Sequence, residues 1–304
     1  MITNRPNRIL VPTDFSEVAT HALRYASDLA RRTGATLTVL YADRFLPPID
    51  YTASLGVWDD TTFALLEARA TEQLHRDAET NIDPSVPFLA VVRVAAPIDG
   101  ILSQARESGA GMIVMGTHGR SSFRRLVIGS VTEEVMRRAE VPVIAVPPAG
   151  MASPSMRTIL CPVIYNSQCF EALEFAATIA PPDARFIVVG AATSEKWADI
   201  DRDLADLREW VPASIASRAD FKLLMRGHVT EQVEHYARIA HADLIVTSEQ
   251  LDRSATDRLQ GSFAERLMQH SDRPVLTVNA RAARTVAHGG VMREQTRQTV
   301  PAHF

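Results

Sequence analysis

The sequence predicts an α/β protein built from two similar domains, each with a parallel sheet covered by helices on both faces. Continuously apolar segments alternate with amphipathic segments, which is the pattern of parallel strands and their crossover helices. In addition, the segment Ile9–Pro12 (ILVP) reappears as Ile159–Pro162 (ILCP), and Gly129-Ser130 reappears as Gly261-Ser262. A repeat of this length indicates two whole domains and not a solenoid.

The first half divides into five strands and four helices. Ser16 suits the N-cap of the first helix and Gly34 its C-cap, and Pro97 suits the first turn of the third. The expected strands are Arg8–Val11, Thr36–Ala42, Phe88–Val94, Met112–Met115 and Val143–Val146. The expected helices run from Ser16 to about Thr33, from Thr61 to Thr80, onward from Pro97, and from Val131 to Arg138.

The second half repeats this order of elements. The expected strands are Thr158–Cys161, Arg185–Val189, Phe221–Met225, Leu244–Thr247 and Val275–Val278. The expected helices lie around Phe170–Ile179, Ile200–Ile215 and Thr230–Ala240, with a last helix after Gly261. We therefore place the two domains at residues 1–149 and 155–280, a linker at 150–154, and a disordered tail at 281–304, where the periodicity disappears.

Composition indicates a soluble cytoplasmic protein. Of the 304 residues 46% are hydrophobic, and the net charge of -4 argues against non-specific binding of nucleic acid. The two cysteines, Cys161 and Cys169, are too few for a disulfide framework and are expected to be buried as small hydrophobic residues. The polar N-terminus does not resemble a secretory signal, and no apolar run is long enough to span a membrane.

The segment Gly116–Gly119 (GTHG), followed nine residues later by Gly129-Ser130, predicts a phosphate-binding loop. It lies between an apolar strand and a helix, which is the context that phosphate loops require. Glycine allows backbone N–H groups to approach a phosphate closely, and the start of a helix favours anions. Ser130 adds a hydroxyl donor, and Arg120, Arg124 and Arg125 add positive charge. The alternative is that these glycines serve only turns and a helix cap.

Together, this loop and the segment Ile9–Ser16 (ILVPTDFS) resemble the motifs of ATP-binding universal stress proteins, and the resemblance covers Arg8–Val278. It implies two Rossmann-like, doubly wound five-stranded domains of the adenine nucleotide alpha hydrolase-like kind, with nucleotide at the carboxyl ends of the strands. It implies ATP as ligand, with Mg2+ held by its phosphates. The implied binding residues are Pro12, Thr13, Asp14, Ala42, Met115, Gly116, Gly119, Arg120, Gly129, Ser130 and Val131.

Within that set the resemblance assigns Asp14 to adenosine, and Pro12, Thr13 and Ala42 to the walls around adenine. The glycines, Ser130 and Val131 would take the phosphates. For Asp14 the alternative is a structural residue at the start of the first helix.

The second half departs from this pattern. The repeat places Ser248 where the first half has Gly116, Leu251 in place of Gly119, and Ile164 in place of Asp14. A side chain at Leu251 would obstruct a phosphate, and Ile164 cannot accept a hydrogen bond. We expect this second site to be empty or to bind something else.

The degenerate domain is expected to be the structural partner of the first. The two would pair through their final strands, Val143–Val146 and Val275–Val278. A homodimer through the same strands and an unidentified protein partner are further expectations.

The expected function is regulation of a stress response, with ATP as a switch ligand and no catalytic residue. A general base, a Walker lysine and an acidic metal-binding pair are all missing from the loop. Slow Mg-dependent ATP hydrolysis and a nucleotide-independent scaffold or holdase are the alternatives. His118 is expected to be an exposed loop residue, and the spacing of His228, His235 and His241 does not suit a metal site.

Overall fold

The computed structural model describes residues 5–45, 60–118, 128–148, 155–163, 165–192, 197–224, 229–249, 262–279 and 281–282. The strands of the first half are β1 (Arg8–Pro12), β2 (Thr36–Asp43), β3 (Phe88–Val94), β4 (Met112–Gly116) and β5 (Val143–Val146). Those of the second half are β6 (Thr158–Pro162), β7 (Arg185–Ala191), β8 (Ala219–Leu224), β9 (Leu244–Glu249) and β10 (Val275–Asn279).

The helices alternate with these strands. The first half contains α1 (Glu17–Thr33), α2 (Asp60–Asn81), α3 (Pro97–Ser108) and α4 (Ser130–Arg138). The second half contains α5 (Ser167–Ile179), α6 (Trp197–Trp210), α7 (Ala213–Ala216), α8 (Val229–Ile239) and α10 (Phe263–His270).

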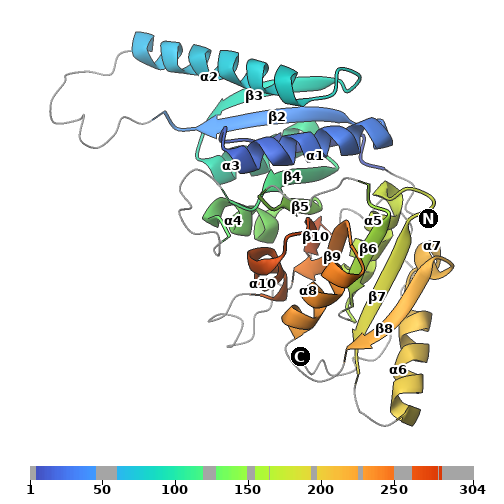
Figure 1. The fold of residues 1–304 in the computed structure, drawn as a ribbon. Coiled ribbons are helices and arrows are strands. Elements are labelled where there is room, and N and C mark those ends of the chain that lie inside the picture. The colour runs from blue at the N-terminus through green and yellow to red at the C-terminus, as the bar shows by residue number, and fades with distance from the viewer. Residues whose placement is uncertain are drawn as a thin grey trace.

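All ten strands join in one sheet, in the order β3-β2-β1-β4-β5-β10-β9-β6-β7-β8. Neighbouring strands within each half are parallel, which confirms the predicted fold class. The halves meet through β5 and β10, which pair antiparallel with Leu276 opposite Ile144 (Figure 1). This confirms the expected pairing of the domains through their final strands. A homodimer through these strands is not compatible with this arrangement, because β4 and β9 occupy their other edges.

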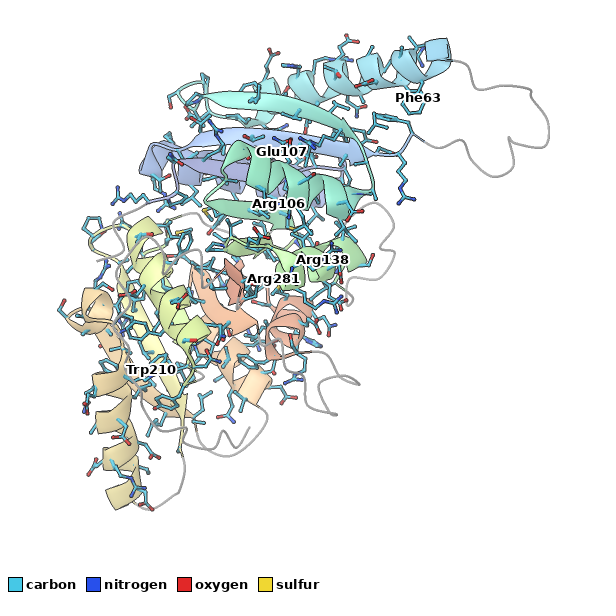
Figure 2. The ribbon with its side chains drawn as sticks, turned by 180° about the vertical axis from the view of Figure 1, so that it is seen from behind. Phe63, Arg106, Glu107, Arg138, Trp210 and Arg281 are labelled. Atoms are coloured by element: carbon cyan, nitrogen blue, oxygen red, sulfur yellow. The ribbon has the colours of Figure 1, made fainter. Side chains whose placement is uncertain are left out.

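Two apolar layers enclose the sheet, and each extends across both halves. One layer lies under α1, α2 and α5 and includes Leu23, Ile144 and Leu276. The other lies under α3, α4, α8 and α10 and includes Met115 and Leu267. Figure 2 shows α2, which carries the labelled Phe63, and α6, which ends at Trp210, at opposite ends of the molecule. Each apolar layer therefore continues from one domain into the other.

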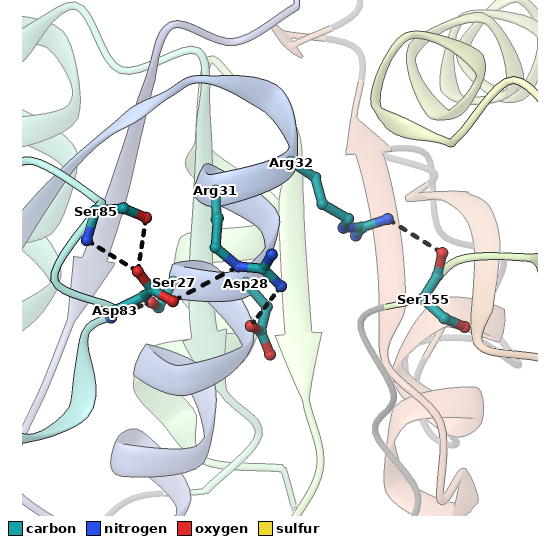
Figure 3. Close-up of polar contacts among 7 residues, drawn as sticks. All are labelled: Ser27, Asp28, Arg31, Arg32, Asp83, Ser85 and Ser155. Carbon is teal, nitrogen blue, oxygen red and sulfur yellow. Dashed lines mark hydrogen bonds and ion pairs between the residues drawn. The ribbon is translucent and has the colours of Figure 1, made fainter.

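Helix α1 is tied to both domains by polar contacts (Figure 3). The Ser27 hydroxyl oxygen accepts the N–H of Asp83, at 2.8 Å, which fixes the segment that follows α2. A second contact of this helix reaches the other domain: the Arg32 guanidinium donates to the Ser155 carbonyl at 3.1 Å. These contacts hold the first helix of the first domain against the start of the second.

The predicted helix ends are largely confirmed. Ser16 caps α1 by accepting the N–H of Ala19, and Gly34 ends it with a φ of 74°. The single helix predicted around Ile200–Ile215 is wrong, since the structure divides it into α6 and α7 at Pro212. Proline lacks an N–H and disfavours the helical conformation in the residue before it, which explains the break.

Both cysteines are fully buried, as predicted. No helix among the described residues is long and apolar enough to cross a membrane. The linker at 150–154 and tail residues 283–304 lie outside the described residues, and the domain boundaries placed beside them stay predictions.

Candidate functional site

The candidate site lies where the strand order of the first domain reverses. Strand β1 has β2 on one side and β4 on the other, with Ile9 opposite Met112 in the second pair. The chain therefore leaves β1 and β4 at the same edge of the sheet, and the following helices α1 and α4 pack on opposite faces. Ligands of open α/β sheets bind at this switch point.

At the end of β1, the segment from Thr13 to Ser16 forms a tight turn that places Asp14 at the site. The Thr13 N–H donates to the Leu40 carbonyl at 2.8 Å, which holds the turn against β2. The Asp14 carboxylate accepts the N–H of Ser16 at 3.1 Å, while Ser16 itself caps α1. Asp14 is thus not the N-cap of the helix, and its half-buried carboxylate stands at the carboxyl end of β1.

The same turn contains a residue in an unusual conformation. Phe15 has a φ of 62°, in the left-handed region that bulky residues rarely adopt. Its ring packs against Tyr41 with centroids 4.7 Å apart, and Tyr41 in turn contacts Phe45. Strain of this kind costs about 1 to 3 kcal/mol and persists only where the surroundings impose it. This conformation fixes how the chain turns from β1 into α1.

Gly116, the last residue of β4, has a packing role that the loop motif does not predict. A Cβ atom at this position would lie 2.8 Å from Cγ1 of Val18 in the first turn of α1. Its carbonyl oxygen accepts the Thr132 hydroxyl of α4 at 2.8 Å. Gly116 therefore allows α1 to approach β4 closely and also anchors the first turn of α4.

Two backbone hydrogen bonds close the loop that follows β4. The Thr117 N–H donates to the Val146 carbonyl at 2.9 Å, and the Gly129 N–H donates to the Thr117 carbonyl at 2.8 Å. The Thr117 hydroxyl also lies 2.8 Å from Nδ1 of His118. The two ends of the loop are thus brought together. Gly119 and Arg120, together with the remaining loop arginines, lie outside the described residues.

The start of α4 has the features of an anion site. Gly129 is the N-cap, with φ -62° and ψ 135°, a conformation open to any residue. Glycine is therefore not required there by the backbone, and it leaves the helix start without a capping side chain. The first N–H groups of a helix have no partner within the helix and carry its positive dipole end. Ser130 is exposed and Val131 half-buried in this first turn.

Three apolar residues of the predicted binding set lie on the same face of the sheet. Met115 belongs to the apolar layer under α3 and α4, and Ala42 and Val131 pack against that layer. Gly100 of α3 lies so close to Ala42 that an added Cβ atom would be 2.7 Å from the Cβ of Ala42. A small residue at each position therefore lets α3 lie close to the end of β2.

The corresponding point of the second domain is filled by its own side chains. Ser262 and Glu265 form a capping box at the start of α10: Oε2 of Glu265 accepts the Ser262 N–H at 2.7 Å, and the Ser262 hydroxyl accepts the Glu265 N–H at 3.2 Å. Ser248, in the place of Gly116, is buried and donates to the side-chain oxygen of Asn166 at 3.5 Å. Ile164 and Leu251 lie outside the described residues.

The structure thus brings together the predicted residues of the β1 end, the β4 end and the α4 start. Nothing in the sequence pattern indicates Thr132, whose buried hydroxyl joins α4 to β4, or the row of aromatic rings beginning at Phe15. Thr132 follows Gly129-Ser130 closely, but nothing in the spacing indicates that its hydroxyl bonds a strand carbonyl.

Comparisons with known proteins agree with this architecture. Residues 6–147 match the model of the Universal stress protein family. Universal stress protein MJ0531 of Methanocaldococcus jannaschii is 29% identical over 143 residues, which are 47% of this chain and 83% of that protein. Universal stress protein MJ0577 of the same organism is 26% identical over 151 residues, 46% of this chain and 93% of that protein.

Two solved structures extend the likeness in fold to both domains. A universal stress protein from Archaeoglobus fulgidus aligns with a TM-score of 0.63 and 20% identity, over 90% of this chain and 96% of that chain. A putative universal stress protein from Pseudomonas aeruginosa aligns with a TM-score of 0.57 and 14% identity, over 93% and 96%. The first domain therefore belongs to the universal stress protein family, and the second domain shares the fold of the solved members that align with both halves.

Proposed function

We propose that the first domain binds ATP at its switch point and that the nucleotide acts as a switch ligand in a stress response. The observation that carries this proposal is the start of α4, where Gly129 leaves a helix N-terminus uncapped directly beside the ends of β1 and β4. Such a helix end offers free N–H donors and a favourable dipole to a phosphate group.

In this arrangement the adenosine lies at the end of β1. Asp14 would accept a hydrogen bond from it, and Pro12, Thr13 and Ala42 would wall the base. Met115 lies beneath, in the apolar layer shared with Ala42. The polar groups suit the two ends of ATP: a carboxylate at the end of β1 can accept a hydrogen bond from adenosine, and the N–H donors at the start of α4 can bind phosphate.

The phosphates lie at the other end of the site, on the N–H groups of Ser130 and Val131. Gly129, whose own N–H donates to the Thr117 carbonyl, carries no side chain that would obstruct them. Gly116 ends β4 at this side of the site, the loop residues Gly119 and Arg120 would add an N–H donor and positive charge, and Mg2+ would be held by the phosphates themselves. We assign no catalytic residue, so the nucleotide's binding and release would carry the signal, and an unidentified protein would receive it.

We further propose that one chain holds one nucleotide. In the second domain, Glu265 is 5% exposed, and its carboxylate accepts the Ser262 N–H at the start of α10, where a phosphate would otherwise bind. Placing phosphate beside this carboxylate would bring two negative groups together in a buried position.

The test is calorimetric titration of the full chain with MgATP, together with mass spectrometry of any small molecule that copurifies. The expected stoichiometry is one ATP per chain. Gly129→Asp should weaken ATP at least tenfold, because it places a carboxylate at the phosphate end, while the helix keeps or gains a few tenths of a kcal/mol.

Gly129→Asn is the matched control, since it adds a cap of the same shape without charge and should weaken ATP less. A Gly129→Asp variant that binds ATP like the wild type would contradict the placement of the phosphates. Two ATP per chain would contradict the account of the second domain.

A further inference from the structure

A buried side chain of the second domain holds the far end of α4. Asn279, the last residue of β10, is 2% exposed. Its amide nitrogen donates to the carbonyls of Met136 at 2.6 Å and Ala139 at 2.9 Å, at the C-terminal end of α4. Its amide oxygen accepts the N–H groups of Arg281 at 2.8 Å and Ala282 at 3.0 Å.

These four partners fix the orientation of the amide. The amide nitrogen of Asn279 faces two carbonyl acceptors, and its oxygen faces two N–H donors. If the amide were rotated by 180°, its oxygen would face the two carbonyls and its nitrogen would face the two N–H groups, so all four hydrogen bonds would be lost. Figure 2 shows the result in space, with Arg138 of α4 and Arg281 after β10 labelled next to each other. The last carbonyls of a helix have no partners within the helix, and here the other domain supplies them.

The helix held in this way is short enough to move as one body. Its nine residues span about 13 Å at 1.5 Å per residue. Thr132 fixes the first turn to the Gly116 carbonyl of β4, and Asn279 fixes the end to β10. A shift at the Asn279 end would therefore change the direction of the N–H groups at Ser130 and Val131.

The first domain has no equivalent of Asn279 at the corresponding position. Gly261 lies 132 positions after Gly129, and the same offset places Pro147 at the position in the first domain that corresponds to Asn279 (279 - 132 = 147). Proline has no side-chain donor, so this position cannot hold the end of α10 in return. The second domain thus supports the helix of the domain that keeps the phosphate loop.

We propose that Asn279 is a positioning residue for nucleotide binding, through which the second domain orients α4 toward the phosphates. This inference rests on the proposed ATP site and gives the degenerate domain a part in that site. Asn279 does not touch the nucleotide, and its effect is confined to the phosphate end, since Asp14 and Ala42 lie on other elements.

The test compares ATP with adenosine, which lacks the phosphates, by competition titration on the wild type and on Asn279→Asp. The variant keeps the shape and the acceptor but loses both donors to α4. ATP binding should weaken about tenfold, the equivalent of one charge-assisted hydrogen bond, while adenosine affinity stays within twofold. Thr277→Val is the control, because Thr277 lies on the same strand and donates to Val143 of β5, 3.4 Å away, instead of to α4.

The stoichiometry separates this effect from loss of structure. A protein that is only partly folded binds less ATP per chain at an unchanged Kd, whereas a misplaced helix changes the Kd at full stoichiometry. An Asn279→Asp variant with wild-type ATP affinity, or with equal losses for ATP and adenosine, overturns the inference. A wild-type protein that binds neither ligand overturns the proposed function and the inference with it.

A second measurement needs no variant and covers an Asn279→Asp protein that does not fold. In the wild type, ATP should slow hydrogen exchange at the amides of Arg281 and Ala282, which donate to Asn279, together with those of the first turn of α4. Slowing confined to the first turn of α4 overturns the inference.

Discussion

Replacing Gly116 with alanine tests whether this glycine is required by packing against α1. An added Cβ atom would lie 2.8 Å from Cγ1 of Val18 and 3.3 Å from the carbonyl carbon and oxygen of Val18. The first distance is shorter than a Cβ atom tolerates, and the other two are shorter than an ordinary van der Waals contact. Either α1 moves away from β4 or Val18 leaves its rotamer, and overpacking of this kind costs about 1 to 3 kcal/mol.

The assay is a double-mutant cycle measured by urea unfolding of the wild type, Gly116→Ala, Val18→Ala and the double variant. Val18→Ala removes the nearest atom, so it should reduce the cost of the alanine by about 1 kcal/mol. Relief should be partial, because the backbone atoms of Val18 remain 3.3 Å from the new Cβ.

Gly109→Ala is the control for a glycine that is needed for a different reason. Gly109 has a φ of 63° at the end of α3, and an added Cβ atom would meet no atom within 4 Å. Alanine there should cost about 1 to 2 kcal/mol from backbone strain alone, with no coupling to Val18. A coupling of Gly116 and Val18 within about 0.3 kcal/mol of zero would refute the packing argument.

Two further predictions concern α5. Burial, with a smaller contribution from Glu174, raises the pKa of Glu171 to about 7. The folded protein thus favours the protonated carboxyl of Glu171, so the contribution of this group to stability is fully present below about pH 4.5 and is lost as the pH rises through 7. Glu171→Gln should therefore stabilise the protein by about 1 kcal/mol at pH 8, after discounting for solvent screening, and should change its stability little at pH 4.5. An equal variant-minus-wild-type difference in urea unfolding at both pH values would contradict this. Asn166 caps α5 by accepting the Cys169 N–H at 2.7 Å, so Asn166→Ala should cost about 1 kcal/mol and Asn166→Ser should restore most of it; an alanine variant as stable as the wild type would show that the cap contributes nothing.

Much of the fold was predictable because it depends on local signals. Apolar runs placed the strands, and Ser16 and Gly34 placed the ends of α1 through their own cap chemistry. The repeat gave the pairing of β5 with β10, since two copies of a domain that ends in a strand can pair symmetrically at that edge. The sequence pattern does not predict the break at Pro212, because the apolar periodicity continues through the proline.

The site was predictable only in part, for a physical reason. The ends of β1 and β4 meet because parallel topology brings them together, and the motifs at those ends indicate a ligand. The need for a glycine at 116 comes from Val18, 98 positions away in the sequence (116 - 18 = 98), and Asn279 bonds carbonyls 143 and 140 residues away. Contacts of that separation depend on the packed structure and leave no pattern in a single sequence.

The starts of α4 and α10 are equivalent in the two domains but are capped differently. A capping box such as that of Ser262 and Glu265 stabilises a helix by about 1 kcal/mol, and α4 has Gly129 in place of a capping side chain. A functional site is expected where a helix lacks a stabilising cap although the backbone conformation would allow one. In the domain with the better capped helix, the Glu265 carboxylate occupies the start of α10, the position at which we propose that the first domain binds phosphate. The two helix ends together therefore predict one nucleotide per chain, bound by the domain whose helix start is left open.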